Sequence, residues 1–220
     1  MTRMDIQEAK SVVCDAGKKL LAIGLVEGTW GNISVKIDEN RMVITPSGKK
    51  YENQTPDDMV VVNIHDLSYE GPLKPSSERG LHAEIYKQRK NINAVIHNHS
   101  THACTVAAAR KDIPPIMDDM VQIVGPSIRV ADYAISGTKK LTKNVIKALK
   151  GRNGALLANH GAVCIGRDLD EAFVTCQVLE KACKIFVDVQ SIGGGVSINK
   201  VEAFAMHQYF LKKYSKQAME

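Results

Sequence analysis

Residues 94–104 read AVIHNHSTHAC, and the interpretation of the whole sequence starts from this stretch. It holds three of the seven histidines within six positions, directly after a short apolar run. The run NAVIHNH has the length and composition of a strand. Because alternate side chains of a strand share a face, His97 and His99 point the same way and Asn98 points oppositely. His102 lies beyond the strand end, so we do not expect it to reach the same point.

The flanking sequence alternates between helical and strand patterns. Periodic apolar residues predict helices at residues 5–25, 78–88, 101–109, 138–149, 168–189 and 201–214. Short β-rich or apolar runs bounded by Gly, Asn and Pro predict strands at residues 30–37, 41–46, 59–64, 93–99, 127–133, 155–158 and 162–166. No repeat or linker interrupts the pattern, which therefore predicts one α/β domain over residues 1–220, with a mobile C-terminal helix and tail at 201–220.

Composition excludes several classes of protein. Hydrophobic residues make up 44% and charged residues 24% of the chain, as in globular proteins, and no apolar run is long enough to span a membrane. The N-terminus lacks the apolar segment of a secretory signal, so we expect a cytoplasmic protein. The net charge of +5 is spread along the chain and only 5% of residues are aromatic, which argues against a nucleic-acid partner. The five scattered cysteines form no CxxC pair and are interpreted as buried free thiols.

The paired histidines fit a metal site, although a buried polar pair remains an alternative. Burying two imidazoles on one face requires compensation, which a bound ion supplies. His160, on a Gly-containing turn after another apolar strand, is either a third ligand or an ordinary turn histidine. Glu78, at the start of a helix, is either a carboxylate ligand or part of a helix cap, for which Ser76 and Ser77 are further candidates. Three imidazoles and one carboxylate would suit Zn²⁺, with Mn²⁺ or Co²⁺ as competitors.

At this point the sequence resembles a known family, the class II aldolases and epimerases, which also includes the noncatalytic adducin head. The resemblance extends from the first predicted helix to about Val189 and includes, in the family's order, EGTWGNISVKI, ITPSGKKYENQTPDDMVVVN, KPSSERGLHAEIYKQRKNINAVIHNHS, YAISGTKKLTKNVIKAL and LLANHGAVCIG. It implies a single-domain three-layer α/β/α sandwich with a central mixed, largely antiparallel sheet. It also implies a metal held by His97, His99, His160 and Glu78, the last of which can leave the metal and act as general base.

The resemblance further implies a phosphate site, and the matching residues have suitable chemistry. Its members would be Gly31, Asn32, Ser47, Gly48, Ser76 and Ser77. Amide, hydroxyl and backbone N–H donors next to a helix N-terminus can bind a phosphate dianion without a cluster of cations. Glycines allow the backbone to approach the ligand closely. Each dipeptide alone is typical of a turn or a cap.

The residue after the serine pair separates the reactions of the family. It is Glu in the fuculose-phosphate aldolase type and Asp in the ribulose-phosphate epimerase type, so Glu78 favours an aldolase. Such an enzyme would reversibly cleave a phosphorylated ketose, a fuculose 1-phosphate or 5-deoxyribulose 1-phosphate analogue, to dihydroxyacetone phosphate and an aldehyde. A sugar-phosphate dehydratase of the methylthioribulose 1-phosphate type and a 4-epimerase are the alternatives. A noncatalytic scaffold and a nucleic-acid-binding module fit less well.

The proton donor to the aldehyde oxygen is the main departure from the aldolase pattern. The family's tyrosine, contributed by a neighbouring subunit, is absent, and Asp118 lies near its place, where Asp118 and Asp119 could instead cap the adjacent structure. A second family tyrosine corresponds to either Tyr209 or Tyr214, and Tyr214 is our candidate. The resemblance also implies a homotetramer with active sites between subunits.

Overall fold

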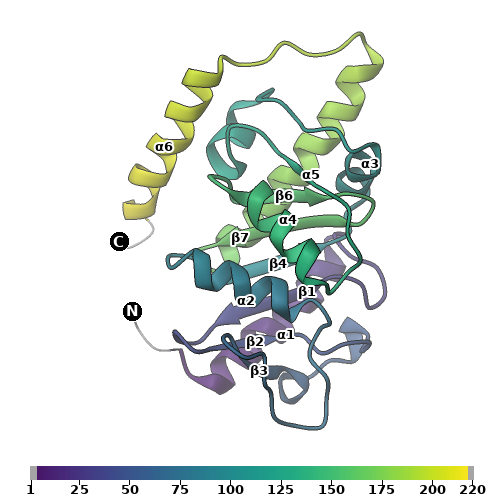
Figure 1. Ribbon diagram of the computed structural model, residues 1–220, viewed down its shortest axis with the longest axis vertical. Helices are drawn as coiled ribbons and strands as arrows, with labels where there is room; N and C mark the ends of the chain where they lie inside the picture. The colour runs from purple at the N-terminus through teal and green to yellow at the C-terminus, as the bar shows by residue number, and fades with distance from the viewer. Residues whose placement is uncertain (1–3, 218–220) are drawn as a thin grey trace.

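A seven-stranded sheet forms the centre of the molecule in the computed structural model, which describes residues 4–217 apart from the side chains of 214–217 (Figure 1). The strand order is β3-β2-β1-β4-β7-β6-β5, and neighbouring strands are antiparallel except β5 and β6, which are parallel. The strands are β1 (Asn32–Lys36), β2 (Arg41–Ile44), β3 (Val60–Asn63), β4 (Ala94–Asn98), β5 (Val130–Ala131), β6 (Gly154–Leu157) and β7 (Gly161–Gly166). The mixed, largely antiparallel sheet is confirmed.

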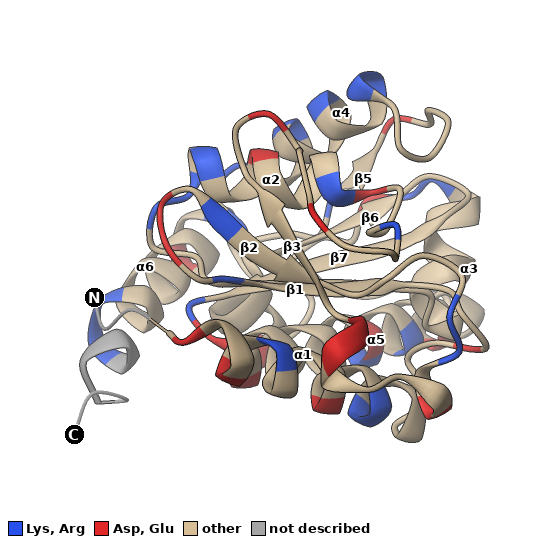
Figure 2. Cartoon of the chain, turned by 90° about the horizontal axis from the view of Figure 1, so that it is seen from below, with Lys and Arg blue, Asp and Glu red and all other residues tan. Residues whose placement is uncertain are grey.

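Helices cover both faces of this sheet, which gives the expected three layers (Figure 2). One layer consists of α1 (Ile6–Ala22), α3 (Thr101–Ala109) and α5 (Leu169–Ser191), and the other of α2 (Arg79–Gln88) and α4 (Lys139–Leu149). The predicted helices at 5–25, 101–109, 138–149 and 168–189 are therefore found with small shifts of their ends. Each layer buries its own apolar core against the sheet, and this burial is the main stabilising contribution.

Strand alternation decides which side chains face which layer. On β1, Ile33 belongs to the core under α1, whereas Ser34 bonds His82 of α2 on the opposite face. On β4, Ile96 and Val95 likewise belong to opposite cores. The side chains of Asn32 and His97, which are paired across β1 and β4, therefore share the face covered by α2 and α4.

The start of α2 differs from the expected cap. Glu78 occupies the N-cap position and no side chain makes a capping hydrogen bond there, so the predicted Ser76 or Ser77 cap is wrong. The Ser76 hydroxyl instead accepts a hydrogen bond of 3.2 Å from the Glu78 backbone N–H. This short-range bond turns the chain one residue before the helix begins, and the Glu78 side chain is buried next to the sheet.

A single π-helical turn at η3 (Met120–Val124) was not predicted. Its hydrogen bonds span five residues, so it lacks the 3.6-residue periodicity used to recognise helices. The last helix, α6 (Lys200–Gln217), packs against this turn, where His207 Nδ1 donates to the Gln122 carbonyl oxygen at 2.8 Å. The helix predicted at 201–214 is thus present, and the mobility of residues 201–220 stays a prediction.

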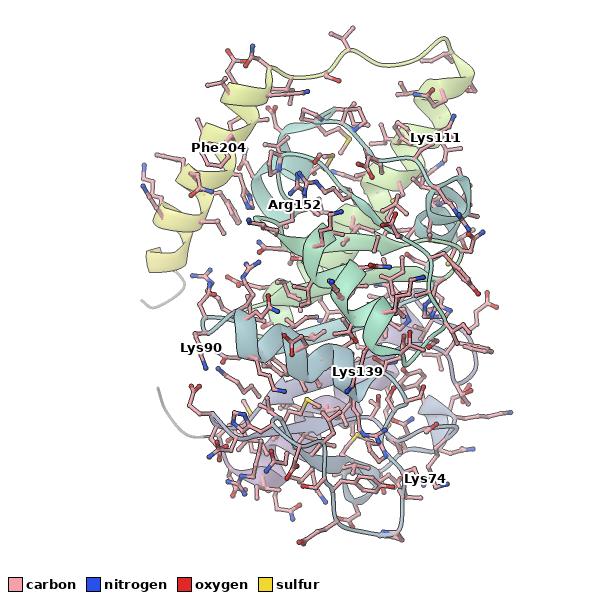
Figure 3. All side chains as sticks on the ribbon, in the orientation of Figure 1. Lys74, Lys90, Lys111, Lys139, Arg152 and Phe204 are labelled. Carbon is pink, nitrogen blue, oxygen red and sulfur yellow. The ribbon has the colours of Figure 1, made fainter. Side chains whose placement is uncertain are left out.

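The surface and the thiols agree with the composition. Lys and Arg occur on both helical layers together with Asp and Glu (Figure 2), and the labelled Lys74, Lys90, Lys111 and Lys139 lie over different parts of the molecule (Figure 3).

All five cysteines are free, and only Cys104 among them is not fully buried. Among residues 4–217, no helix has both the length and the apolar character needed to cross a bilayer.

Candidate metal centre and active site

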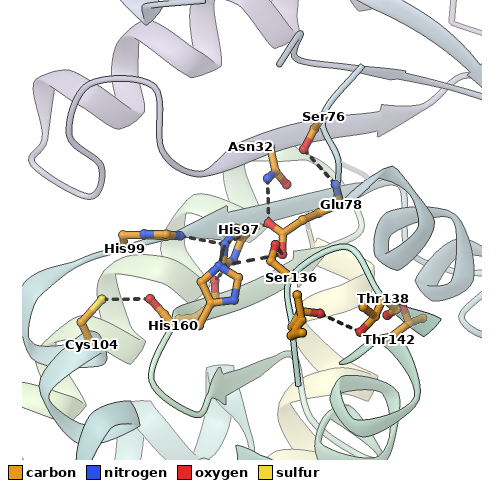
Figure 4. Close-up of polar contacts among 12 residues, drawn as sticks. Asn32, Ser76, Glu78, His97, His99, Cys104, Ser136, Thr138, Thr142 and His160 are labelled. Carbon is orange, nitrogen blue, oxygen red and sulfur yellow. Dashed lines mark hydrogen bonds and ion pairs between the residues drawn. The ribbon is translucent and has the colours of Figure 1, made fainter. Parts of the chain in front are cut away.

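The side chains of His97, His99 and His160 converge at one point beside the sheet (Figure 4). His97 lies on β4, His99 follows that strand directly, and His160 lies in the turn between β6 and β7. The Nε2 atom of His97 is 2.9 Å from Nε2 of His99 and 3.2 Å from Nε2 of His160. The predicted same-face pair and the third histidine are therefore brought together.

Backbone pairing brings the third histidine to the other two. The register of β4 against β7 pairs His97 with Val163 and Asn98 with Ala162, so the preceding turn lies over the end of β4. Gly161 is required at this crossing, because a Cβ atom there would lie 2.4 Å from the Asn98 carbonyl oxygen. The Asn98 side chain points to the opposite face, as predicted, where its amide lies 3.3 Å from the Cys176 sulfur.

Contacts outside the cluster orient the rings of His97 and His99. His97 Nδ1 donates to the Ala162 carbonyl oxygen at 2.9 Å, which leaves the lone pair of Nε2 directed at the other two histidines. The His99 ring stacks on Trp30 with centroids 5.8 Å apart. A carbonyl partner behind a histidine ring is typical of metal-binding histidines, because it fixes the tautomer and raises the basicity of the ligand nitrogen.

The Glu78 carboxylate completes the cluster. Its Oε2 atom lies 3.1 Å from His97 Nε2 and accepts a hydrogen bond of 3.0 Å from the Asn32 amide. Its Oε1 atom lies 3.9 Å from His160 Nε2 and accepts a hydrogen bond of 3.1 Å from the Ser136 hydroxyl. The Glu78 side chain is only 5% exposed, so an opposite charge or several donors must compensate its burial.

Burial and mutual repulsion favour the neutral form of the His99 and His160 rings, beside an ionised Glu78 carboxylate. Burial, together with nearby His97 and His160, lowers the pKa of His99 to about 3, and burial also lowers the pKa of His160. Burial alone would raise the pKa of Glu78, but the neighbouring histidines and the Asn32 hydrogen bond lower it to about 2. At neutral pH the cluster therefore presents an ionised Glu78 carboxylate beside the neutral rings of His99 and His160.

This donor set fits a divalent cation. Two nitrogens bound to one zinc ion at about 2.0–2.1 Å lie about 2.8–3.4 Å apart at octahedral or tetrahedral angles. The nitrogen separations of 2.9 and 3.2 Å agree with that geometry. Three Nε2 atoms aimed at one another cannot all be satisfied by hydrogen bonds between them, whereas a shared cation would satisfy all three.

A cavity of about 210 Å³ opens beside the cluster. All six residues of the predicted phosphate site line it, as do Glu78, His99 and His160, and the remaining lining residues are Thr29, Trp30, Pro46 and Ser136. Gly31 has a φ of 78°, and a Cβ atom there would lie 2.7 Å from the His97 carbonyl oxygen, so only glycine fits. Among the described residues, the lining contains hydroxyl, amide and backbone donors but no Lys or Arg.

Asp118, one of the two predicted proton donors, is not in this cavity. Asp118 is exposed and is absent from the lining residues, so a role there would require a neighbouring subunit. Asp119 rather than Asp118 caps η3, accepting from the Met120 N–H, and it also forms an ion pair with Lys181. The Tyr214 side chain lies outside the described residues, and Tyr209 is exposed.

Sequence reasoning missed three residues of the site. Ser136 contacts Glu78 across 58 positions of the chain, and Trp30 stacks on the His99 ring. Gly161 permits the close approach of the His160 turn. A usable signal existed for each of them, because Ser136 lies in YAISGTKK, Trp30 in EGTWGN and Gly161 in LLANHG, all within the stretches that resemble the family.

Comparisons with known proteins agree with this geometry. The model of the class II aldolase and adducin N-terminal domain matches residues 11–187. The chain is 35% identical to a 5-deoxy-D-ribulose 1-phosphate aldolase of Bacillus thuringiensis serovar kurstaki over 86% of this chain and 89% of the relative. It is 33% identical to an L-fuculose phosphate aldolase of Escherichia coli strain K12 over 92% of this chain and 93% of the relative.

A solved structure gives the same result. An L-fuculose 1-phosphate aldolase superimposes with a TM-score of 0.89 and 35% sequence identity, over 96% of this chain and 99% of that one. This chain belongs to the class II aldolase and adducin N-terminal domain family.

Proposed function

We propose that this protein is a divalent-metal-dependent aldolase that reversibly cleaves a ketose 1-phosphate to dihydroxyacetone phosphate and an aldehyde. The main supporting observation is the convergence of three imidazole nitrogens and the Glu78 carboxylate beside a cavity lined by hydroxyl and amide donors. The names of the two curated relatives point to substrates of the fuculose 1-phosphate or 5-deoxyribulose 1-phosphate kind.

His97, His99, His160 and Glu78 would hold the ion, and nitrogen ligands of this kind favour Zn²⁺, with Mn²⁺ or Co²⁺ as competitors. A divalent ion supplies Lewis-acid chemistry, polarising the ketose carbonyl and stabilising the charge left when the C3–C4 bond breaks. The protein contributes fixed ring orientations through the Ala162 carbonyl and the Trp30 stack, so the ligands need little rearrangement on binding.

The hydroxyl and amide groups of the cavity would bind the phosphate. Asn32, Ser47, Ser76 and Ser77 line one cavity, and the N-terminus of α2 begins beside it. Backbone N–H groups next to Gly31 and Gly48 can approach an oxygen closely, because neither residue has a side chain in the way. A neutral cradle of this kind holds the dianion by many hydrogen bonds rather than by a salt bridge.

Glu78 would transfer the proton at C3. In cleavage, the electron pair of the C3–C4 bond would move to C3, where Glu78, having first taken up a proton from solvent, would form the new C–H bond and return to the carboxylate. The C4 hydroxyl proton leaves to a second group when the aldehyde forms. In condensation both transfers are reversed, with the carboxylate as the base.

Two features stay predictions from the sequence: the group that exchanges the proton of the aldehyde oxygen, and the oligomeric state. Asp118 of a neighbouring subunit, or Tyr214 of the C-terminal helix, would exchange the proton of the aldehyde oxygen. Because Asp118 is exposed away from the cavity of its own chain, a shared site would require a homotetramer or another closed assembly. We also propose a cytoplasmic location and no nucleic-acid or membrane partner.

The test is a panel of ketose 1-phosphates incubated with the purified protein loaded with Zn²⁺ or Mn²⁺. The panel should include L-fuculose 1-phosphate, 5-deoxyribulose 1-phosphate and methylthioribulose 1-phosphate, with dihydroxyacetone phosphate measured through a coupled dehydrogenase. We expect release with at least one substrate and loss of release after chelation. Loss of water or inversion at C4 without any three-carbon phosphate would instead establish a dehydratase or an epimerase.

A further inference from the structure

The two oxygens of the Glu78 carboxylate have different surroundings. Oε2 faces buried His97 at 3.1 Å and the Asn32 amide at 3.0 Å. Oε1 is farther from its nearest histidine nitrogen, 3.9 Å from Nε2 of His160, and accepts the Ser136 hydroxyl at 3.1 Å. Both donors, Asn32 and Ser136, line the cavity, and the two oxygens differ in that Oε1 lies farther from the histidine nitrogens than Oε2 does (Figure 4).

The segment that holds Ser136 is fixed by groups other than its own side chain. Thr138 caps α4, with its hydroxyl accepting from the Leu141 N–H and donating to the Ile135 carbonyl oxygen at 2.6 Å. Gly137 adopts a φ of 74°, and a Cβ atom there would lie 3.2 Å from the Ser77 carbonyl oxygen. The backbone therefore presents the Ser136 hydroxyl to Glu78 whether or not the hydroxyl contributes to folding.

We infer that Ser136 is a positioning residue that holds Oε1 of Glu78 as the oxygen that exchanges a proton with the substrate. This inference rests on the proposed function, in which Glu78 is both a metal ligand and a proton carrier. A carboxylate with two equivalent free oxygens could rotate or bind the ion through either one. A donor fixed on Oε1, the oxygen farther from the histidine nitrogens, separates the two roles and holds the proton-carrying oxygen in one orientation.

A substitution of Asn32, the donor to Oε2, would not test this inference, because Asn32 also belongs to the proposed phosphate site. Ser136 donates from a loop that joins β5 to α4, and its contact with Glu78 spans the two halves of the layer formed by α2 and α4. Removing its hydroxyl therefore changes the orientation of Oε1 without removing a ligand of the ion or a group of the phosphate cradle.

The experiment compares Ser136→Ala with Ser136→Thr and with Thr142→Ala. Thr142 is the matched control, because its hydroxyl bonds the Thr138 carbonyl oxygen on the same segment and does not contact Glu78. For each variant, kcat and KM are measured with the best substrate of the panel, and the Zn²⁺ dissociation constant is measured separately by chelator competition. The metal measurement does not depend on turnover.

We expect Ser136→Ala to lower kcat by about 10- to 100-fold, with KM and the Zn²⁺ dissociation constant within about threefold of the wild type. Ser136→Thr should restore most of kcat. Thr142→Ala should leave kcat, KM and the Zn²⁺ dissociation constant unchanged. An unchanged kcat in Ser136→Ala would overturn the inference, and so would a parallel loss of Zn²⁺ affinity, which would mean that Ser136 supports the ligand cluster as a whole. Wild-type protein that binds no metal and releases no dihydroxyacetone phosphate would instead contradict the proposed function.

Discussion

Two glutamate–histidine pairs lie on opposite faces of the sheet, and only one of them belongs to the candidate site. Glu78 meets His97 on the face covered by α2 and α4, and Glu180 meets His102 in the layer of α1, α3 and α5. The first pair is 5% and 0% exposed, and the second is 21% and 33% exposed. His97 and His102 are five positions apart in the same short stretch of sequence.

The partners of each carboxylate explain the difference. Glu180 accepts from the backbone N–H groups of His102 and Ala103 at 2.9 and 2.8 Å, and from the His102 ring at 2.8 Å. Ser100, the N-cap residue of α3, makes no capping hydrogen bond, so Glu180 supplies the cap from α5. Glu78 meets no helix N–H donor of this kind and faces two histidine nitrogens. A metal centre thus requires converging lone pairs, which residue types alone do not provide.

The largest effect should follow removal of a converging nitrogen. We expect His97→Ala to lose bound metal and nearly all activity, because it removes the central ligand and leaves a buried carboxylate without its partner. Elemental analysis of the purified variant measures the first effect. Because His97 is fully buried, His99→Ala should be tested in parallel as a less buried ligand, and a full metal complement in both folded variants would refute the ligand assignment.

A smaller effect should follow replacement of Glu78, the proposed proton carrier, by a side chain of the same shape. Glu78→Gln keeps the shape of the side chain and its contacts with Asn32 but cannot transfer a proton, so kcat should fall by about 10²- to 10⁴-fold. Binding of a substrate phosphate ester, measured by calorimetry, should be retained. Undiminished kcat would show that another group transfers the proton.

Strand alternation on β4 was sufficient to predict that His97 and His99 share a face and that Asn98 does not, because that geometry is local. His160 and Glu78 had local alternatives, a turn residue and a helix cap, and the family resemblance was needed to assign them. Their meeting depends on the register of β4 with β7 and on the path of the chain into α2. The contact of Ser136 with Glu78 depends on a loop conformation, for which the sequence has no periodic signal.

The wrong cap assignment at α2 has a related cause. Serine before a helical pattern usually marks an N-cap, but the Ser76 hydroxyl bonds the Glu78 N–H and the helix starts after Glu78. The competing local bond moves the helix start by one residue and directs Glu78 to the sheet. At α3, conversely, a cap comes from a residue 80 positions beyond Ser100, which no local pattern could indicate.

The Glu180–His102 pair should affect the stability of the fold rather than metal binding or turnover. Glu180→Gln should lower the free energy of unfolding by about 1 kcal/mol at pH 7 while leaving metal content and kcat unchanged. Burial alone would raise the pKa of Glu180, but hydrogen bonds from the His102 and Ala103 backbone and from side chains lower it. Its charge therefore adds stability above the unfolded pKa of about 4.3, and this contribution is lost as the pH falls through the lower folded value.

Urea unfolding of wild type and variant over a pH series measures that contribution. The difference between the two curves should be constant above about pH 5 and should narrow below it. Groups that do not contact Glu180 affect both proteins equally and cancel in the difference. A gap that stayed constant down to the acid limit would mean that the Glu180 charge does not cap α3.

The smallest effect should come from His102, the third histidine of the opening stretch. His102→Gln keeps a donor for Glu180 and leaves the backbone cap intact, so unfolding should change by less than about 0.5 kcal/mol. Metal content and kcat should stay within about twofold of the wild type, because the ring bonds Glu180 on the opposite face from the cluster. If His102→Gln released metal as His97→Ala does, the division of the stretch into a ligand pair and a helix-capping residue would be wrong. If only the substitutions of His97 and His99 release metal, the three neighbouring histidines serve two unrelated purposes, because strand alternation and a helix start direct them to different faces.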